Sequence, residues 1–115
     1  MLFDSGRCKI FELIDVAEPG DMPQPKLRLH SEPYYGERTV GFSRQYSAKS
    51  VNEQVDLLIR IWQDKSVKVN MYVIPEDGEQ YRVSLVQHLK DEDDLNVTDL
   101  TLERLENYYE FDAEN

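Results

Sequence analysis

The sequence predicts a mainly β protein: one small antiparallel β-barrel or sandwich, with room for one short helix near residues 47–54. Three observations predict this class. Apolar and polar residues alternate with a period of two in most of the apolar stretches, which is typical of strands with one buried face. Turn signals rich in proline and glycine separate these stretches. One pair of stretches also flanks a sequence that favours a β-hairpin turn. Short strands joined by regular turns indicate a barrel or a sandwich.

The strands expected in the first half of the chain are separated by proline-rich segments. Residues 8–16 alternate as a strand and end at the loop Glu18–Pro25, where three prolines cannot join a hydrogen-bonded ladder. A second strand is expected from Lys26, with Leu27 and Leu29 on one face. Residues 33–36 (Pro-Tyr-Tyr-Gly) indicate a turn, and residues 37–46 a third extended stretch.

The second half carries the strongest strand signals. Residues 55–62 are apolar on both faces, which favours a strand that is buried on both sides. Residues 67–73 and 80–86 alternate on either side of Pro75–Gly78, whose proline, aspartate and glycine favour a tight hairpin turn. The acidic segment 91–94 is expected to be a loop, and residues 97–105 a last strand. The predicted core consists of Ile59, Trp62, Val69, Met71, Tyr81 and Val83.

Length and composition favour a single domain. A chain of 115 residues can bury one modest core without metals or disulfides. Cys8 is the only cysteine, so it cannot form an intramolecular disulfide, and a packed thiol on a strand is its expected role. We expect residues 1–106 to form one β-rich domain. Residues 107–115 have little to bury, and we expect them to form a mobile acidic tail.

The negative charge is concentrated at the end of the sequence. The net charge is −10, and residues 91–115 contain ten acids and one base, which leaves −1 for residues 1–90. An acidic surface of this kind repels phosphates, so binding to DNA by release of counterions is disfavoured. The pattern suits a solubilising face or a contact with a basic protein.

The inventory of reactive residues favours a protein that is not an enzyme. The sequence contains no glycine-rich phosphate loop, and His30 and His88 lie outside any metal-binding spacing. Counted as a calcium loop from Glu92, the acidic segment places Val97 where the sharp turn requires glycine. We therefore expect no catalytic residue, no bound metal and no cofactor.

Protein contacts are the expected work of the exposed loops and of the tyrosines. Irregular exposed segments are where binding residues usually lie, and tyrosine is enriched at interfaces. The tyrosines can equally cover the rim of a small core. The candidate contact residues are Glu18, Asp21, Pro23, Glu76, Asp77, Asp91, Glu92, Asp93, Asp94, Tyr108 and Tyr109.

Four stretches, taken in order, carry a resemblance to a known family. They are Glu37–Phe42 with Arg44, Tyr46, Ala48 and Lys49, then Val55–Ile61, then Asp77–Val83 with Val86 and Gln87, and last Thr98–Glu106. Their succession resembles the head–tail joining, or head-closure (stopper), proteins of siphophages that infect Gram-positive bacteria. The loop Glu18–Pro25 departs from that pattern, and the match before residue 37 is weak.

The resemblance implies a small β-barrel that assembles as a homo-oligomeric ring in the virion. Such a ring lies below the portal and its adaptor, helps to close the DNA-filled head, and docks the tail through a tail-completion protein. DNA would pass through it without specific binding, and no membrane is involved. The protein would be made in the host cytoplasm and end at the head–tail interface. The alternative hypothesis is a small acidic phage inhibitor that mimics DNA and blocks a host nucleic-acid-binding protein.

Overall fold

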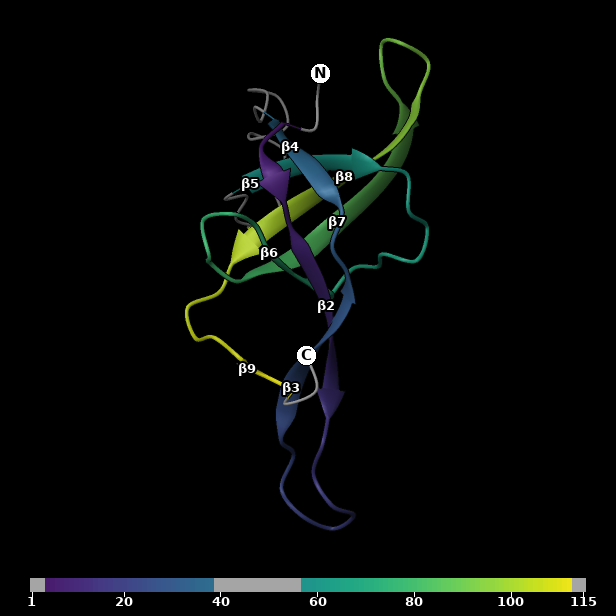
Figure 1. Cartoon of the computed structure of the whole chain (residues 1–115). Helices are drawn as coiled ribbons and strands as arrows, with labels where there is room; N and C mark the ends of the chain where they lie inside the picture. Colours follow the sequence, from purple (N-terminus) through teal and green to yellow (C-terminus); the bar gives the residue numbers. More distant parts are fainter. Residues whose placement is uncertain (1–3, 39–56, 113–115) are drawn as a thin grey trace, which may run out of the picture.

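A computed structural model describes residues 4–38 and 57–112, and these residues form strands, turns and loops with no helix among them. The strands build one curled, mixed sheet in the order β1-β4-β5-β8-β7-β6-β2-β3-β9 (Figure 1). The mainly β, barrel-like fold predicted from the sequence is confirmed. The strands are β1 (Gly6–Arg7), β2 (Lys9–Asp15), β3 (Pro25–Ser31), β4 (Tyr34–Arg38), β5 (Leu57–Trp62), β6 (Tyr72–Ile74), β7 (Tyr81–Lys90), β8 (Asn96–Arg104) and β9 (Glu110–Phe111).

The sheet curls because strands β1 to β4 form one long, two-stranded antiparallel ribbon, which is interrupted at Cys8. β1 pairs with β4 and β2 pairs with β3, both antiparallel. Only Cys8 separates β1 from β2, and its N–H donates to the carbonyl of Pro33, 3.0 Å away, in the gap between β3 and β4. The free edge of β4 pairs with β5, whereas that of β2 pairs with β6. The sheet thus bends back toward its own first strand and encloses a core.

The far half of the β2–β3 hairpin extends beyond this barrel. In Figure 1 the hairpin projects from the rest of the molecule, with the loop of residues 16–24 at its tip. It accounts for the elongated shape of the molecule, which measures 50 × 30 × 24 Å. The ladder is continuous from Leu29, opposite Phe11, to Pro25, opposite Asp15.

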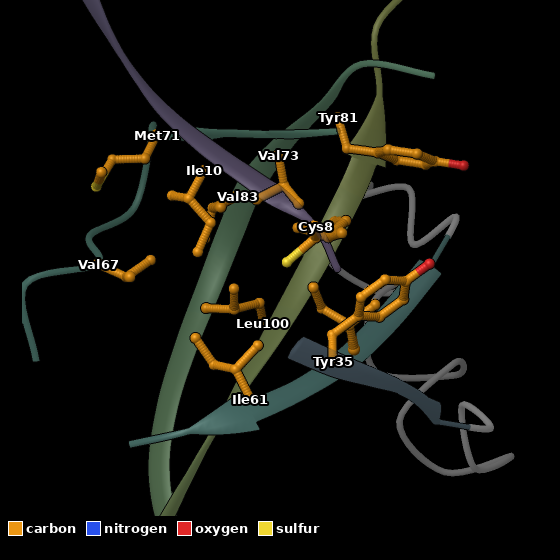
Figure 2. Close-up of a cluster of buried hydrophobic side chains, with 12 residues drawn as sticks. Cys8, Ile10, Tyr35, Ile61, Val67, Met71, Val73, Tyr81, Val83 and Leu100 are labelled. Carbon is orange, nitrogen blue, oxygen red and sulfur yellow. The ribbon is translucent and has the colours of Figure 1, made fainter. Parts of the chain in front are cut away.

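The core lies on the concave side of the curled sheet. Figure 2 shows its side chains pointing toward one another from β2, β4, β5, β6, β7 and β8. Fully buried aliphatic side chains from neighbouring strands fill this interior, as the period-two patterns require. The members of the cluster are Cys8, Ile10, Tyr35, Ile59, Ile61, Val67, Met71, Val73, Tyr81, Val83, Leu100 and Leu102.

The strongest strand signals of the sequence are confirmed. β5 has four successive buried residues, Leu58 to Ile61, so both of its faces are covered as predicted. β8 pairs with β5 on one side and with the ten-residue β7 on the other. The hairpin between β6 and β7 is also present: the N–H of Gly78 donates to the carbonyl of Pro75 at 3.1 Å, and Gly78 has a φ of 78°.

The turn predicted at residues 33–36 is wrong. β4 begins at Tyr34, and the buried Tyr35 lies opposite Gly6 on β1. Both tyrosines favour extended backbone, and Gly36 is buried opposite Arg60 on β5 instead of reversing the chain. The extended stretch predicted for residues 37–46 therefore starts earlier, at residue 34. Its continuation beyond Arg38, and the helix predicted near residues 47–54, lie outside the described residues.

The prediction that Trp62 and Val69 belong to the core is wrong. The side chains of Trp62 and Val69 are 48% and 46% exposed. Trp62 is the last residue of β5, so it lies at the rim of the barrel. The strand predicted over residues 67–73 is shorter in the structure, where it covers Tyr72–Ile74. Residues 64–71 form turns that place Val67 and Met71 in the core and leave Val69 exposed to solvent. Asn70, with a φ of 72°, adopts the left-handed conformation that this path needs.

The acidic end of the chain packs against the sheet in part. Glu110–Phe111 forms β9, which pairs in parallel with Lys26 and Leu27 of β3. The ring of Phe111 lies 5.3 Å from that of Phe11. The predicted domain boundary after residue 106 and the mobility of residues 107–115 stay predictions. The structure nevertheless places a strand of this segment on the second, smaller apolar cluster of Phe11, Leu27 and Tyr72.

Candidate protein-contact surfaces

The predicted contact residues lie on three separate loops. Glu18, Asp21 and Pro23 are exposed at the tip of the β2–β3 hairpin. The loop of residues 91–94 connects β7 to β8 at the opposite end of the molecule (Figure 1). The turn of residues 75–78 lies between β6 and β7. The structure therefore does not combine the three loops into one surface.

The hairpin tip is held in shape by Asp15. Its Oδ1 accepts hydrogen bonds from the N–H groups of Ala17 and Gln24, each at 3.0 Å. These two bonds hold the pKa of Asp15 below its ordinary value. Beyond them the exposed residues Glu18 to Pro23 carry two acids, two prolines and Met22, which is 83% exposed. The tip is thus a defined protrusion that combines negative charge with an apolar side chain.

The turn of residues 75–78 forms hydrogen bonds with other parts of the molecule. The N–H of Glu76 donates to the Tyr35 hydroxyl at 3.1 Å, and its Oε1 accepts from the N–H of Arg7 at 3.2 Å. The hydroxyl of Tyr81 donates to Oδ2 of Asp77 at 2.8 Å. Glu76 thus joins the β6–β7 turn to β1 and β4, and Asp77 joins it to the first residue of β7. Their role within the molecule is structural, whether or not they also contact a partner.

The acidic loop of residues 91–94 has the geometry of a turn. Oδ1 of Asp91 accepts from the N–H groups of Asp93 and Leu95, each at 2.9 Å. Asp94 has a φ of 65°, which closes the loop, and lies 3.6 Å from the ammonium group of Lys90. Glu92, Asp93 and Asp94 are exposed. Of the three predicted loops, this one presents the most negative charge to solvent.

The two neighbouring tyrosines near the C-terminus have different surroundings. Tyr108 is 48% exposed. Tyr109 lies edge-on against Tyr72, with ring centroids 5.3 Å apart, and its backbone exchanges two hydrogen bonds of 2.9 Å with the side chain of Gln80. Burial and the hydrogen bond with Tyr109 raise the pKa of Tyr72 to about 12. Tyr109 therefore belongs to the smaller core, and Tyr108 remains available for contact.

The charge separation seen along the sequence is partly cancelled in space. Five acids of the C-terminal quarter lie within 4 Å of bases from the first 90 residues. The pair Arg60–Asp99 is buried, and the others are partly or largely exposed. The pairs are Lys26–Glu110, Arg28–Asp112, Arg60–Asp99, Arg82–Glu103 and Lys90–Asp94. The acids of this quarter thus do not form one continuous unpaired surface.

One cluster resembles a catalytic set but has the wrong order of donors. Nε2 of His30 lies 2.8 Å from Oγ of Ser66, and Ser66 donates to Oδ1 of Asp64. A nucleophilic serine donates its hydrogen bond to the histidine that will take its proton, whereas the hydroxyl of Ser66 donates its hydrogen bond to the carboxylate. Although partial burial opposes ionisation, the hydrogen bonds from Ser66 hold the pKa of Asp64 below its ordinary value. The cluster closes the turn after β5.

The part of the chain that the structure describes holds no group of three or more histidines, cysteines or acids placed to bind a metal ion. Nor do these residues include a helix long and apolar enough to cross a membrane.

An apolar pocket at the base of the hairpin was not predicted. Its volume is about 340 Å³, and it is lined by Lys9, Phe11, Leu29, Ile74, Gly78 and Phe111. Phe11 forms the buried floor, while Leu29 and Phe111 are 39% and 49% exposed at the sides. The pocket therefore offers accessible apolar surface with one cationic side chain.

The sequence contains a partial signal for this pocket. Phe11 and Leu29 are opposite each other on β2 and β3, and their alternation with polar residues places them on one face of the hairpin. The contribution of Phe111 has no local signal, because it depends on the parallel pairing of β9 with β3 across more than 80 residues of chain. Residues 107–115 were predicted to form a mobile tail, so Phe111 was not expected to line a pocket.

Comparisons with known proteins show a likeness in fold. No protein-family model matches the sequence, and no curated protein matches it. The solution structure of protein SF1141 from Shigella flexneri 2a is similar, with a TM-score of 0.66 and 14% sequence identity. The match covers 89% of this chain and 94% of that chain. The two proteins share a fold.

Proposed function

We propose that this protein is a structural component of a bacteriophage head–tail connector, where copies form a ring below the portal and adaptor. The ring helps to close the DNA-filled head and docks the tail. The observation that carries the proposal is the projecting β2–β3 hairpin, whose tip exposes acids and Met22 well outside the barrel. A rigid barrel with a projecting arm suits a subunit that must contact neighbours in a closed assembly.

The ordered succession of sequence stretches that resembles head-closure proteins supports the same role. Two of these stretches, Val55–Ile61 and Thr98–Glu106, cover most of β5 and β8, which are paired neighbours in the sheet. The resemblance thus includes the scaffold of the barrel and not only its loops. The net charge of −10 also fits a channel through which DNA passes without binding.

The inhibitor hypothesis has less support. A DNA mimic needs unpaired acids spread over one surface at spacings like those of phosphates. Here Asp99 is buried against Arg60, and Glu103 and Glu110 are paired with bases. Other exposed acids lie on separate elements: Glu18 and Asp21 are at the hairpin tip, whereas Glu92, Asp93 and Asp94 are on the loop at the opposite end.

The test is electron microscopy of a lysate of the phage that encodes this chain, with an early stop codon in the gene. We expect separate tails beside tailless heads, many of them emptied of DNA, and restoration of whole particles when the native chain is supplied from a plasmid. Normal infectious particles without the protein would contradict an essential connector role. They would move the inhibitor hypothesis to first place.

A further inference from the structure

The pocket and the hairpin tip of this chain have complementary properties. The tip presents Met22 between the acids Glu18 and Asp21 and the proline Pro23. The pocket presents an apolar floor with the exposed base Lys9 at its edge. Within residues 4–38 and 57–112, Lys9 takes part in no ion pair. An apolar side chain that follows two acids in a short loop matches an apolar pocket with a base at its edge in both chemistry and charge.

The tip cannot reach the pocket of its own chain. The pocket lies at the base of the hairpin, around Lys9 and Phe11, and the tip begins after Asp15. Seven strand residues rising about 3.3 Å each place the tip roughly 20 Å from Lys9. The ladder between β2 and β3 is continuous from Phe11 to Asp15, so this part of the hairpin cannot fold back. Any tip that fills this pocket must come from another molecule.

We propose that the hairpin tip of one copy docks in the pocket of the next copy, with Met22 against the pocket residues Phe11, Ile74 and Phe111. Glu18 and Asp21 then face Lys9. The surfaces joined are different ones, so the contact is heterologous and propagates from copy to copy until a rotation closes it as a ring. This inference rests on the proposed ring and names the contact that builds it.

The fold prepares both surfaces for this contact. Asp15 fixes the start of the tip through its hydrogen bonds to Ala17 and Gln24, so little of the loop has to be ordered on binding. In the pocket, β9 holds Phe111 beside Phe11 through its pairing with β3. Gly78 forms part of the wall, and the space around its Cα is open, which leaves room for an incoming side chain.

The contact can be tested by paramagnetic broadening between copies. A Gln24→Cys variant carrying a nitroxide, which keeps Met22 and both acids of the tip, is mixed with the ¹⁵N-labelled native chain at millimolar concentration; the side chain of Gln24 is exposed. Cys8 will not take the label, because its side chain is fully buried. We expect the amide signals of Lys9, Phe11, Leu29, Ile74 and Phe111 to lose more than half of their intensity. Intact signals at these residues would overturn the proposal.

Two matched arms make the result specific. A nitroxide on Glu92→Cys, in the exposed loop at the opposite end, should leave the pocket signals unchanged. Equal broadening by both labels would mean random collision and would overturn the proposal. Lys9→Glu in the ¹⁵N-labelled chain should remove most of the broadening, because a glutamate at this position repels Glu18 and Asp21 of the tip. Joint Glu18→Lys and Asp21→Lys changes in the nitroxide chain should restore it.

The outcome is distinguishable from that of the proposed function. Specific broadening together with normal phage particles in the stop-codon experiment would retain the contact between copies and exclude the connector role. Tailless heads together with intact pocket signals would retain the connector role and exclude this contact as the one that builds the ring.

Discussion

Arg60 on β5 and Asp99 on β8 are directly opposite each other in the sheet and are joined by two hydrogen bonds within the buried part of the protein. Nε of Arg60 donates to Oδ1 of Asp99 at 2.7 Å, and a terminal guanidinium nitrogen donates to Oδ2 at 3.0 Å. Both side chains are less than 10% exposed. The hydrogen bond to Asp99 raises the pKa of the Arg60 guanidinium further above its ordinary value, so the base stays charged.

Removing one partner of this buried pair should be strongly destabilising. Asp99→Leu leaves the charge of Arg60 buried without compensation, and we expect the free energy of unfolding to fall by about 3–5 kcal/mol. The double variant Arg60→Met with Asp99→Leu should recover most of that loss, because neither charge is then buried. Denaturant unfolding followed by circular dichroism measures both. Glu103→Gln is the control: its pair with Arg82 is about one-third exposed, so the loss should be about 0–1 kcal/mol.

A second prediction separates the true core from the core expected from alternation. Ile59 is fully buried among strands β4, β5 and β8, so Ile59→Ala should lower the free energy of unfolding by about 2–5 kcal/mol. Val69 was predicted to be equivalent but is 46% exposed, and Val69→Ala should change stability by about 0.5 kcal/mol or less. Equal losses in a chemical melt would contradict the path of residues 67–71.

The third prediction concerns the neighbouring tyrosines of the C-terminal segment. Tyr109→Ala removes the edge-to-face contact with Tyr72 and should cost about 1–3 kcal/mol in unfolding free energy. Tyr108→Ala should cost about 0.5 kcal/mol or less, because that side chain is half exposed. Spectrophotometric titration gives an independent readout: the tyrosine with a pKa near 12 should titrate at lower pH in the Tyr109→Ala variant. Identical behaviour of the two variants would mean that residues 107–112 do not pack as described.

The fourth prediction uses the thiol of Cys8. Burial raises its pKa to about 12, from an ordinary value of 9.0, so the folded protein favours the neutral thiol. The stabilisation is complete below about pH 9 and is lost as pH rises from 9 toward 12, because the unfolded chain releases this proton first. The native chain should resist a thiol reagent at pH 8 and react fully when unfolded.

The control for the thiol is Cys8→Ala. Buried tyrosines also lower stability at high pH, so the native chain and the variant should both become less stable between pH 9 and 10. The decline should be less steep in Cys8→Ala, since it lacks the thiol. Rapid labelling of the folded native chain would show instead that β1 and β2 open readily around this residue.

The sequence predicts this fold well where local patterning and tertiary packing demand the same backbone. Strands were predicted over residues 55–62 and 97–105, and the neighbouring strands β5 (Leu57–Trp62) and β8 (Asn96–Arg104) form there. The prediction fails where buried residues lie in turns instead of in a strand. Val67 and Met71 enter the core through turns, so a period of two over residues 67–73 indicates a longer strand than the one that forms.

The candidate contact surfaces were predictable only in part. Exposed loops at residues 18–23 and 91–94 follow from proline, glycine and clustered acids. Glu76 and Asp77 have the same local character, but hydrogen bonds to Arg7, Tyr35 and Tyr81 make them structural. Local composition holds no information about such distant partners. The pocket could not be predicted for the same reason, because Lys9, Ile74 and Phe111 come from three remote parts of the chain.

The pairing of the C-terminal quarter with the rest of the molecule also sets an order of events during translation. Lys26, Arg28, Arg60 and Arg82 leave the ribosome before the acids that will face them, and β3 emerges long before β9. β8, which lies between β5 and β7 in the sheet, is likewise synthesised after both of these neighbours. A nascent chain therefore cannot complete this sheet until β8 and β9 have been synthesised. Premature termination anywhere before β8 would release a chain that lacks the middle of its own fold.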